Sequence, residues 1–237
     1  MAKDASGTLI LFRGSGSGGW AGSAVIGSSW NGMSQILLPG DFSGDGKLDV
    51  MARDGAGSLW LYRGNGAGGW SGSALVGTSW NGMVTIFGAN DFNGDGFNDI
   101  MSRDAAGTLY LYRGNGAGGW LGGGVIGTSW NSFTLLFSPG DFNGDGFADV
   151  MARDTAGNLH LYRGNGSGGW LGSSVIGTGW NWMTQVFGSG DFNGDGFTDV
   201  MAKDGAGSLY LYRGNGSGGW LGSSLAGTSW NSLAIVP

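Results

Sequence analysis

Short apolar runs alternate with turn-forming residues along the whole chain. In one stretch, four such runs occur at 133–137, 148–153, 159–163 and 171–176, and Gly, Asn and Asp residues separate them. Runs of this length with this punctuation are typical of a small antiparallel sheet. Apolar side chains fall on both faces of each run, which indicates a sheet packed between two neighbours. Because no window has sustained helical periodicity, the pattern predicts an all-β protein.

The same pattern returns every 50 residues, five times in all. A period of this length indicates an architecture built from copies of one supersecondary unit. Four strands per unit predict a five-bladed β-propeller of four-stranded antiparallel blades. A parallel β-helix is the alternative fold, but it would use shorter coils. We expect one propeller domain over 1–237, with blades at approximately 30–79, 80–129, 130–179, 180–229, and 230–237 plus 1–29.

This division makes the ends of the chain neighbours in space. Residues 230–237 correspond to the first strand of a unit, and residues 1–29 correspond to its other three strands. We therefore expect the C-terminal strand to pair with the N-terminal strands and to close the ring without a covalent bond.

The amino-acid composition is consistent with a folded, ring-shaped protein. The 55 glycines recur on a fixed register, so they indicate turns rather than disorder. The 12 Trp, 12 Phe and 6 Tyr residues supply the core that a disordered chain lacks. Cysteine is absent, which excludes disulfides. No apolar run reaches the length of a membrane span, so we expect no membrane insertion.

The charge of −6 is concentrated in four loops. All 17 acidic residues are Asp, and 12 of them lie in four segments that we call the Asp loops, at 41–49, 91–99, 141–149 and 191–199. A nucleic-acid-binding protein would instead carry a basic stripe, so we expect no nucleic-acid partner.

The Asp loops share the pattern D-x-[NS]-x-D-G-x-x-D. Side-chain oxygens at positions 1, 3 and 5, a carbonyl at position 7 and Gly at position 6 are what Ca²⁺ needs, and Asp at position 9 would close the cage. The alternative is an Asx-rich turn without an ion. We expect about four structural Ca²⁺ ions, held by Asp41, Ser43, Asp45, Lys47, Asp49, Asp91, Asn93, Asp95, Phe97, Asp99, Asp141, Asn143, Asp145, Phe147, Asp149, Asp191, Asn193, Asp195, Phe197 and Asp199, with the position-7 residues acting through their carbonyls.

The stretch GDFNGDGFADVMARD at 140–154 resembles the FG-GAP/VCBS repeat family, the propeller modules of integrin α-chain heads and of many bacterial secreted proteins. The resemblance covers essentially the whole chain and implies calcium binding by the loop Asp, Asn and Asp side chains and the position-7 carbonyl. Integrin-type propellers have more blades than the five repeats here. A ring of five is similar to tachylectin-type lectins, and FG-GAP-like propellers occur among fungal and bacterial lectins, so both resemblances imply sugar binding.

Two tryptophans recur in every unit. Those at 20, 70, 120, 170 and 220 follow a Gly-rich turn, and we expect them to be wedges between blades. The second set precedes an Asn in the connection to the next blade. An indole with a neighbouring amide suits the C–H face and hydroxyls of a sugar, although a wedge is again the alternative. The candidate ligand-binding residues are Trp30, Asn31, Trp80, Asn81, Trp130, Asn131, Trp180, Asn181, Trp230 and Asn231.

Catalytic residue types are scarce. The chain has no Glu, no Cys and one histidine, His160, whose position holds Ile, Trp or Tyr in the other units. Asp would therefore be the residue left for general acid–base catalysis, so we expect that the protein is not an enzyme. Equivalent grooves around a ring favour a multivalent glycan-binding module. The alternative is a protein-interaction or adhesion propeller, or a targeting appendage of a larger secreted enzyme. Open, all-oxygen calcium sites favour a secreted or cell-surface protein, and we expect a monomer.

Overall fold

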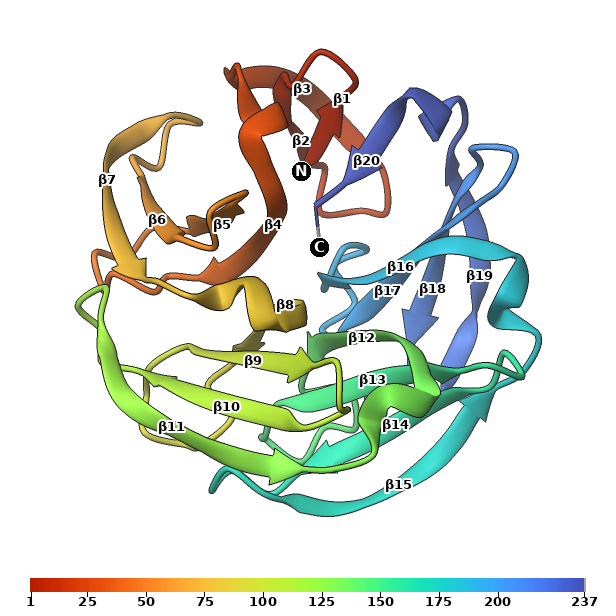
Figure 1. The fold of residues 1–237 in the computed structure, drawn as a ribbon. Coiled ribbons are helices and arrows are strands. Elements are labelled where there is room, and N and C mark those ends of the chain that lie inside the picture. The colour runs from red at the N-terminus through yellow and green to blue at the C-terminus, as the bar shows by residue number, and fades with distance from the viewer. Residues whose placement is uncertain (237) are drawn as a thin grey trace.

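The computed structural model describes residues 1–236, and over that range the chain forms a ring of five four-stranded antiparallel sheets (Figure 1). Helical structure in this range is confined to 3₁₀ turns of three residues at Trp30–Gly32, Trp80–Gly82, Trp130–Ser132, Trp180–Trp182 and Trp230–Ser232. This arrangement confirms the predicted all-β, five-bladed propeller.

Four of the blades are continuous in sequence. Each runs outward from the axis, and the strands β4, β8, β12 and β16 lie innermost. Blade 2 contains β4 (Met33–Gly40), β5 (Asp49–Asp54), β6 (Leu59–Gly64) and β7 (Trp70–Gly77); blade 3 contains β8 (Met83–Asn90), β9 (Asp99–Asp104), β10 (Leu109–Gly114) and β11 (Trp120–Gly127); blade 4 contains β12 (Phe133–Gly140), β13 (Asp149–Asp154), β14 (Leu159–Gly164) and β15 (Trp170–Gly177); blade 5 contains β16 (Met183–Gly190), β17 (Asp199–Asp204), β18 (Leu209–Gly214) and β19 (Trp220–Gly227).

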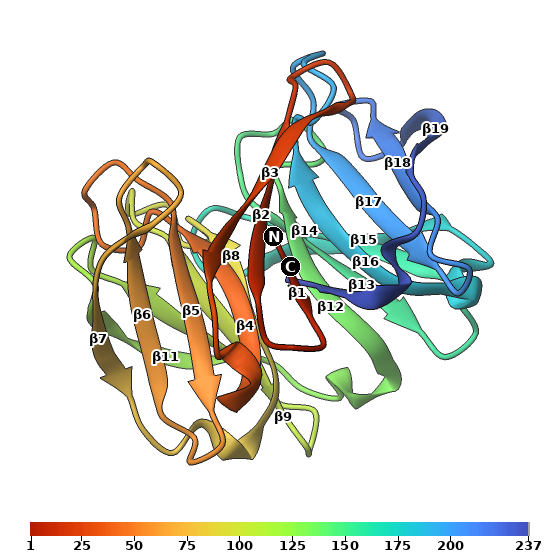
Figure 2. The same ribbon diagram turned by 90° about the horizontal axis from the view of Figure 1, so that it is seen from above.

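Blade 1 combines the two ends of the chain. It contains β20 (Leu233–Ile235), β1 (Ala2–Asp4), β2 (Leu9–Gly14) and β3 (Trp20–Gly27), in that order. The strands β20 and β1 are antiparallel, and Ala2 lies opposite Ile235. The N-terminus lies near the middle of the molecule in the view turned by 90° (Figure 2). The predicted closure of the ring by the C-terminal strand is therefore confirmed.

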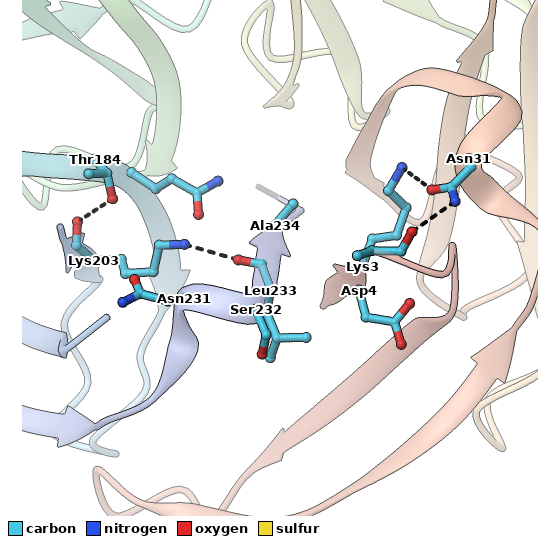
Figure 3. Close-up of a pocket in the computed structure, with 11 residues that line it drawn as sticks. Lys3, Asp4, Asn31, Thr184, Lys203, Asn231, Ser232, Leu233 and Ala234 are labelled. Atoms are coloured by element: carbon cyan, nitrogen blue, oxygen red, sulfur yellow. Dashed lines mark hydrogen bonds between the residues drawn. The ribbon is translucent and has the colours of Figure 1, made fainter. Parts of the chain in front are cut away.

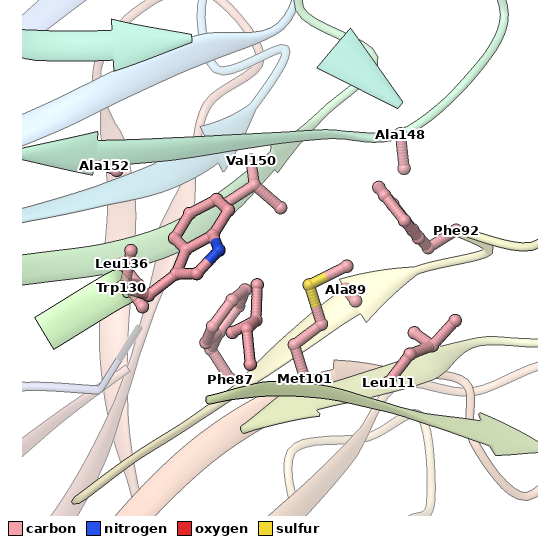
Figure 4. Close-up of a cluster of buried hydrophobic side chains, with 11 residues drawn as sticks. Phe87, Ala89, Phe92, Met101, Leu111, Trp130, Leu136, Ala148, Val150 and Ala152 are labelled. Atoms are coloured by element: carbon pink, nitrogen blue, oxygen red, sulfur yellow. The ribbon is translucent and has the colours of Figure 1, made fainter. Parts of the chain in front are cut away.

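The core lies between blades. In the cluster of Figure 4, Phe87, Met101 and Leu111 of blade 3 pack with Trp130 and Val150 of blade 4. Similar buried clusters occupy the other interfaces. Each blade therefore buries apolar side chains on both faces, as the sequence pattern indicated.

A basic residue at the end of the second strand also joins neighbouring blades. Arg153 of blade 4 donates from Nη1 to the carbonyls of Trp180, at 3.0 Å, and Met183, at 2.7 Å, in the next blade. Lys203 makes the equivalent contacts with Trp230 and Leu233. The cation satisfies main-chain carbonyls at the point where the chain crosses from one sheet to the next.

Candidate functional site

The first Asp of each Asp loop organises the loop around its carboxylate. In the loop at 141–149, Asp141 accepts hydrogen bonds from the N–H groups of Gly144 at 2.7 Å, Asp145 at 3.2 Å and Gly146 at 2.8 Å. Asp145 in turn accepts from the N–H of Phe147 at 3.0 Å. The other three loops repeat the bonds to the first Asp.

The last Asp of each loop is buried and connects the loop to the third strand of its blade. Asp149 accepts from the N–H of Phe142 at 3.0 Å, of Asn143 at 3.2 Å and of Gly164 at 3.1 Å. The corresponding residues Asp49, Asp99 and Asp199 do the same. Sequence reasoning assigned position 9 to a metal alone and missed this main-chain role.

Negative charge accumulates around position 3. Burial raises the pKa of Asp99 and of Asp149 to about 6, and the charges of Asp95 and Asp145 add to the rise. The amide nitrogen of Asn93 donates to Asp95 at 3.0 Å and to Asp99 at 3.4 Å. An amide hydrogen offsets two carboxylates only in part, so a cation at this position would be stabilised.

The residues of the loops fit a calcium ion, although their carboxylates do not converge in the structure. Within residues 1–236, no three His, Cys, Asp or Glu side chains come together as a metal site. The first loop contains a buried oxygen, Ser43 Oγ, that has no hydrogen-bond partner among the described residues. All-oxygen donor sets of carboxylate, amide or hydroxyl and carbonyl groups are those that Ca²⁺ prefers. The presence of calcium remains a prediction.

We expect the loop at 41–49 to bind calcium at least about fivefold more weakly than the other three. Lys47 Nζ lies 3.9 Å from Asp45 Oδ2, whereas the other loops have Phe at this position. A unit charge about 4 Å from another is worth about 1 kcal/mol in water, which corresponds to roughly fivefold in affinity. Calorimetric titration should resolve three stronger sites and one weaker site, and Lys47→Phe should remove the difference. Four equal affinities in the unmodified chain would contradict this prediction.

The tryptophans of the Trp–Asn pairs lie inside the interfaces between blades. Trp30, Trp80, Trp130, Trp180 and Trp230 are only 6–9% exposed. The Trp130 ring lies 4.5 Å from the ring of Tyr162 and 5.5 Å from that of Trp170, measured between centroids. The structure therefore corrects the part of the hypothesis in which these ring faces stack on a sugar, since aromatic side chains already cover them.

The other tryptophan set also connects blades, as predicted. Trp170 Nε1 donates to the carbonyl of Ile126 in the preceding blade at 2.9 Å. The same bond recurs from Trp20, Trp70, Trp120 and Trp220.

The asparagines of the Trp–Asn pairs remain exposed at the grooves between blades: Asn31, Asn81, Asn131, Asn181 and Asn231. Two of them line a cavity of about 460 Å³ between blades 5 and 1 (Figure 3). Its walls also carry Lys3, Lys203 and Gln185. Lys3 Nζ donates to Asn31 Oδ1 at 3.1 Å. The groove therefore offers amide and ammonium donors together with amide oxygens.

Sequence reasoning missed the partner of His160. Its Nε2 lies 3.0 Å from Asp154 Oδ2, and this contact is the largest of the causes that hold the pKa of Asp154 well below its usual range. Tyr110 and Trp60 donate to the equivalent Asp residues at 3.1 Å. The sequence could have indicated this contact, because Trp60, Tyr110 and His160 occupy equivalent positions and each can donate a hydrogen bond.

Each Asp loop also contacts the next blade. The carbonyl of Phe42 accepts from the N–H of Gly118 at 3.1 Å, and the Phe42 ring lies 4.9 Å from that of Trp120. The loops are therefore structural links between blades as well as candidate metal sites. Among residues 1–236, no helix has the length and apolar character that crossing a membrane requires.

The FG-GAP-like repeat model matches residues 41–102, 91–152 and 141–202. No curated protein sequence matches the chain. The fold is similar to that of an Agrocybe aegerita lectin that recognises non-reducing terminal N-acetylglucosamine (19% identity, TM-score 0.56, 91% of this chain and 59% of that one). It is also similar to the lectin BP39L of Burkholderia pseudomallei (22% identity, TM-score 0.57, 94% of this chain and 64% of that one). A third similar structure is AofleA of Arthrobotrys oligospora (13% identity, TM-score 0.52, 92% of this chain and 68% of that one). The chain thus spans less than two thirds of the length of the first two.

Proposed function

Because this chain belongs to the FG-GAP-like repeat family, we propose that it is a calcium-stabilised propeller that binds carbohydrate in the grooves between its blades. The observation that carries the proposal is the similarity in fold to propeller lectins, one of which recognises terminal N-acetylglucosamine. We further propose a secreted or cell-surface location, because weak all-oxygen calcium sites need extracellular calcium levels. We assign the chain no catalytic role.

The exposed asparagines support a polar mode of recognition. An Asn side chain offers two donors and one acceptor oxygen, which can bind adjacent hydroxyls of a sugar. The groove between blades 5 and 1 is the best candidate, because Asn31 and Asn231 line a cavity large enough for a monosaccharide. Similar Asn residues at the other grooves would give several weak sites and hence avidity for clustered glycans.

A glycan array in calcium buffer tests the proposal. We expect binding to a related set of glycans, with those ending in N-acetylglucosamine as the first candidates. The double variant Asn31→Ala/Asn231→Ala should weaken binding several-fold, whereas Ser174→Ala on an exposed outer strand should not. Absence of binding to any glycan at millimolar concentration in solution would refute carbohydrate binding.

One observation favours a protein-interaction propeller as the second candidate. The outermost strands expose apolar side chains at equivalent positions, each more than half exposed or close to it: Val25, Leu75, Val125, Val175 and Leu225. Such residues can contact another protein along the outer edge of the ring. Capture of a defined protein that is lost on Val125→Asp, in a chain that is silent on the array, would favour this candidate.

A further inference from the structure

The groove between blades 4 and 5 contains two side chains that recur in no other unit. Trp182 ends the 3₁₀ turn that leads into blade 5, at a position where the other units have Gly or Ser. Thr155 lies in the turn that follows β13 of blade 4, at a position where the other units have Ala or Gly. The two residues come from different units of the repeat, yet the fold brings them to the same groove.

An asparagine connects the two positions. Asn181 precedes Trp182, and its Nδ2 donates to the carbonyl of Thr155 at 3.2 Å. The side chains of Asn181 and Thr155 are both exposed. Thr155 therefore adds a hydroxyl group beside the exposed amide that this groove shares with the others.

Trp182 is the exposed member of the 12 tryptophans. It is 55% exposed, whereas the others are buried or half-buried. Within residues 1–236, the aromatic ring beside it is that of Tyr210 on β18, at 5.8 Å between centroids and 70° between planes. The rings are thus close but not stacked in parallel. A single exposed apolar residue needs no explanation, but this one forms an aromatic surface with Tyr210 next to uncharged polar groups.

We propose that Trp182 and Tyr210, with Asn181 and Thr155 beside them, form a binding site for one neutral pyranose ring, which we call the Trp182 platform. The inference rests on the proposed carbohydrate binding and adds a site separate from the cavity between blades 5 and 1. The indole packs on the C–H face of the sugar, and the amide and hydroxyl groups bind its hydroxyls.

The chemistry of the platform favours one class of sugar. A pyranose whose ring substituents are all equatorial has only axial C–H bonds on its two faces, so each face is flat and apolar and can pack on an indole. None of the four side chains of the platform carries a charge, which favours a neutral sugar. Because the other units have Gly or Ser in place of Trp182, we expect one such site per chain.

Nuclear magnetic resonance with the β1,4-linked trisaccharide of N-acetylglucosamine as the probe tests the platform in calcium buffer. Trp182→Ser identifies the indole N–H signal of Trp182, and the turn should be retained because two other units have Ser at this position. We expect that signal to shift and to saturate as the trisaccharide is added. The backbone amide of Thr155 reports on the same site when the indole is absent.

Substitutions of Trp182 measure what its ring contributes. Followed at the Thr155 amide, Trp182→Ser should bind the trisaccharide at least about fivefold more weakly, because it loses an aromatic contact. Trp182→Tyr, which keeps a ring, should stay within about threefold of the unmodified chain. A purely structural role of the indole would not produce this difference between Ser and Tyr.

The groove between blades 2 and 3 allows the platform to be copied. Tyr110 and Asn81 already occupy the positions of the tyrosine and the asparagine there. Gly55 and Gly82 occupy the positions of the threonine and the tryptophan; neither has a positive φ, and a Cβ on either would meet no atom within 4 Å beyond its chain neighbours. Gly55→Thr/Gly82→Trp should therefore add a second indole signal that responds to the trisaccharide.

The outcomes separate this proposal from the proposed function. An indole signal of Trp182 that does not shift at millimolar trisaccharide, or equal affinity in Trp182→Ser and the unmodified chain, would overturn the platform. If Asn31→Ala/Asn231→Ala abolished glycan binding and Trp182→Ser left it unchanged, the platform would be wrong and carbohydrate binding would stand. Absence of binding to any glycan would overturn both.

Discussion

Removal of calcium with EDTA is expected to lower the melting temperature of the propeller by about 10 °C or more. A ligand that binds only the folded state stabilises it by RT ln(1 + [L]/Kd), which is about 1.4 kcal/mol per site at a tenfold excess over Kd. Four sites would then contribute about 6 kcal/mol. In a chain of this size, each kcal/mol shifts the melting temperature by about 2–4 °C.

The effect has a physical source in the loops. Without a cation, the buried carboxylates of Asp99 and Asp149 face the charges of Asp95 and Asp145, and main-chain N–H groups and the asparagine amides offset this repulsion only in part. Melting curves by circular dichroism in CaCl₂ and in EDTA check the prediction. Asp145→Ala should reduce the EDTA-sensitive shift by about a quarter, since it affects one of four loops. Superimposable curves in the two buffers would show that the loops are simple turns.

The second large effect concerns the buried tryptophans. Trp130→Ala is expected to lower the free energy of unfolding by about 3–5 kcal/mol, the usual cost of deleting a large aromatic side chain from a core. Trp130 is 6% exposed and packs against Tyr162 and Trp170 of blade 4. Its loss would leave a cavity at the interface of blades 3 and 4.

Trp182 provides the matched control. It occupies the same 3₁₀ turn as Trp180 but is 55% exposed, so Trp182→Ala should change the free energy of unfolding by no more than about 0.5 kcal/mol. Urea denaturation followed by circular dichroism measures both variants. If Trp130→Ala lowered the free energy of unfolding as little as Trp182→Ala, the conclusion that the blades pack on the buried indoles would be wrong.

The fold could be predicted from sequence because its information is repeated. Five copies of one strand–turn pattern define the sheet, and the correspondence of residues 230–237 with the start of a unit defines the closure. The role of the Trp30 set could not be decided in the same way. Tryptophan suits both a buried wedge and a sugar platform, and burial depends on how closely two blades approach, which the repeat period does not encode.

The contacts of the Asp loops could likewise not be predicted from the sequence. The pattern of oxygen donors indicated a metal, but the contact of Phe42 with Trp120 depends on the rotation of one blade relative to the next. The same holds for the bond between Asp149 and Gly164, which joins residues that only the folded hairpin brings together. The cavity lined by Lys3 and Lys203 arises where the two chain ends meet. Residue spacing within one repeat contains no information about that meeting.

The pairing of β1 with β20, which closes the ring, is the weakest strand pairing in the molecule. Both strands have three residues, whereas the inner two strands of the other blades have eight and six. Amide hydrogens at this joint should therefore exchange with solvent faster than those of blade 4, and thermal fraying should start there. A mechanical force applied to the chain ends would act directly on the same short pair of strands. A molecule that is nearly fivefold symmetric in sequence thus has a preferred place at which to open.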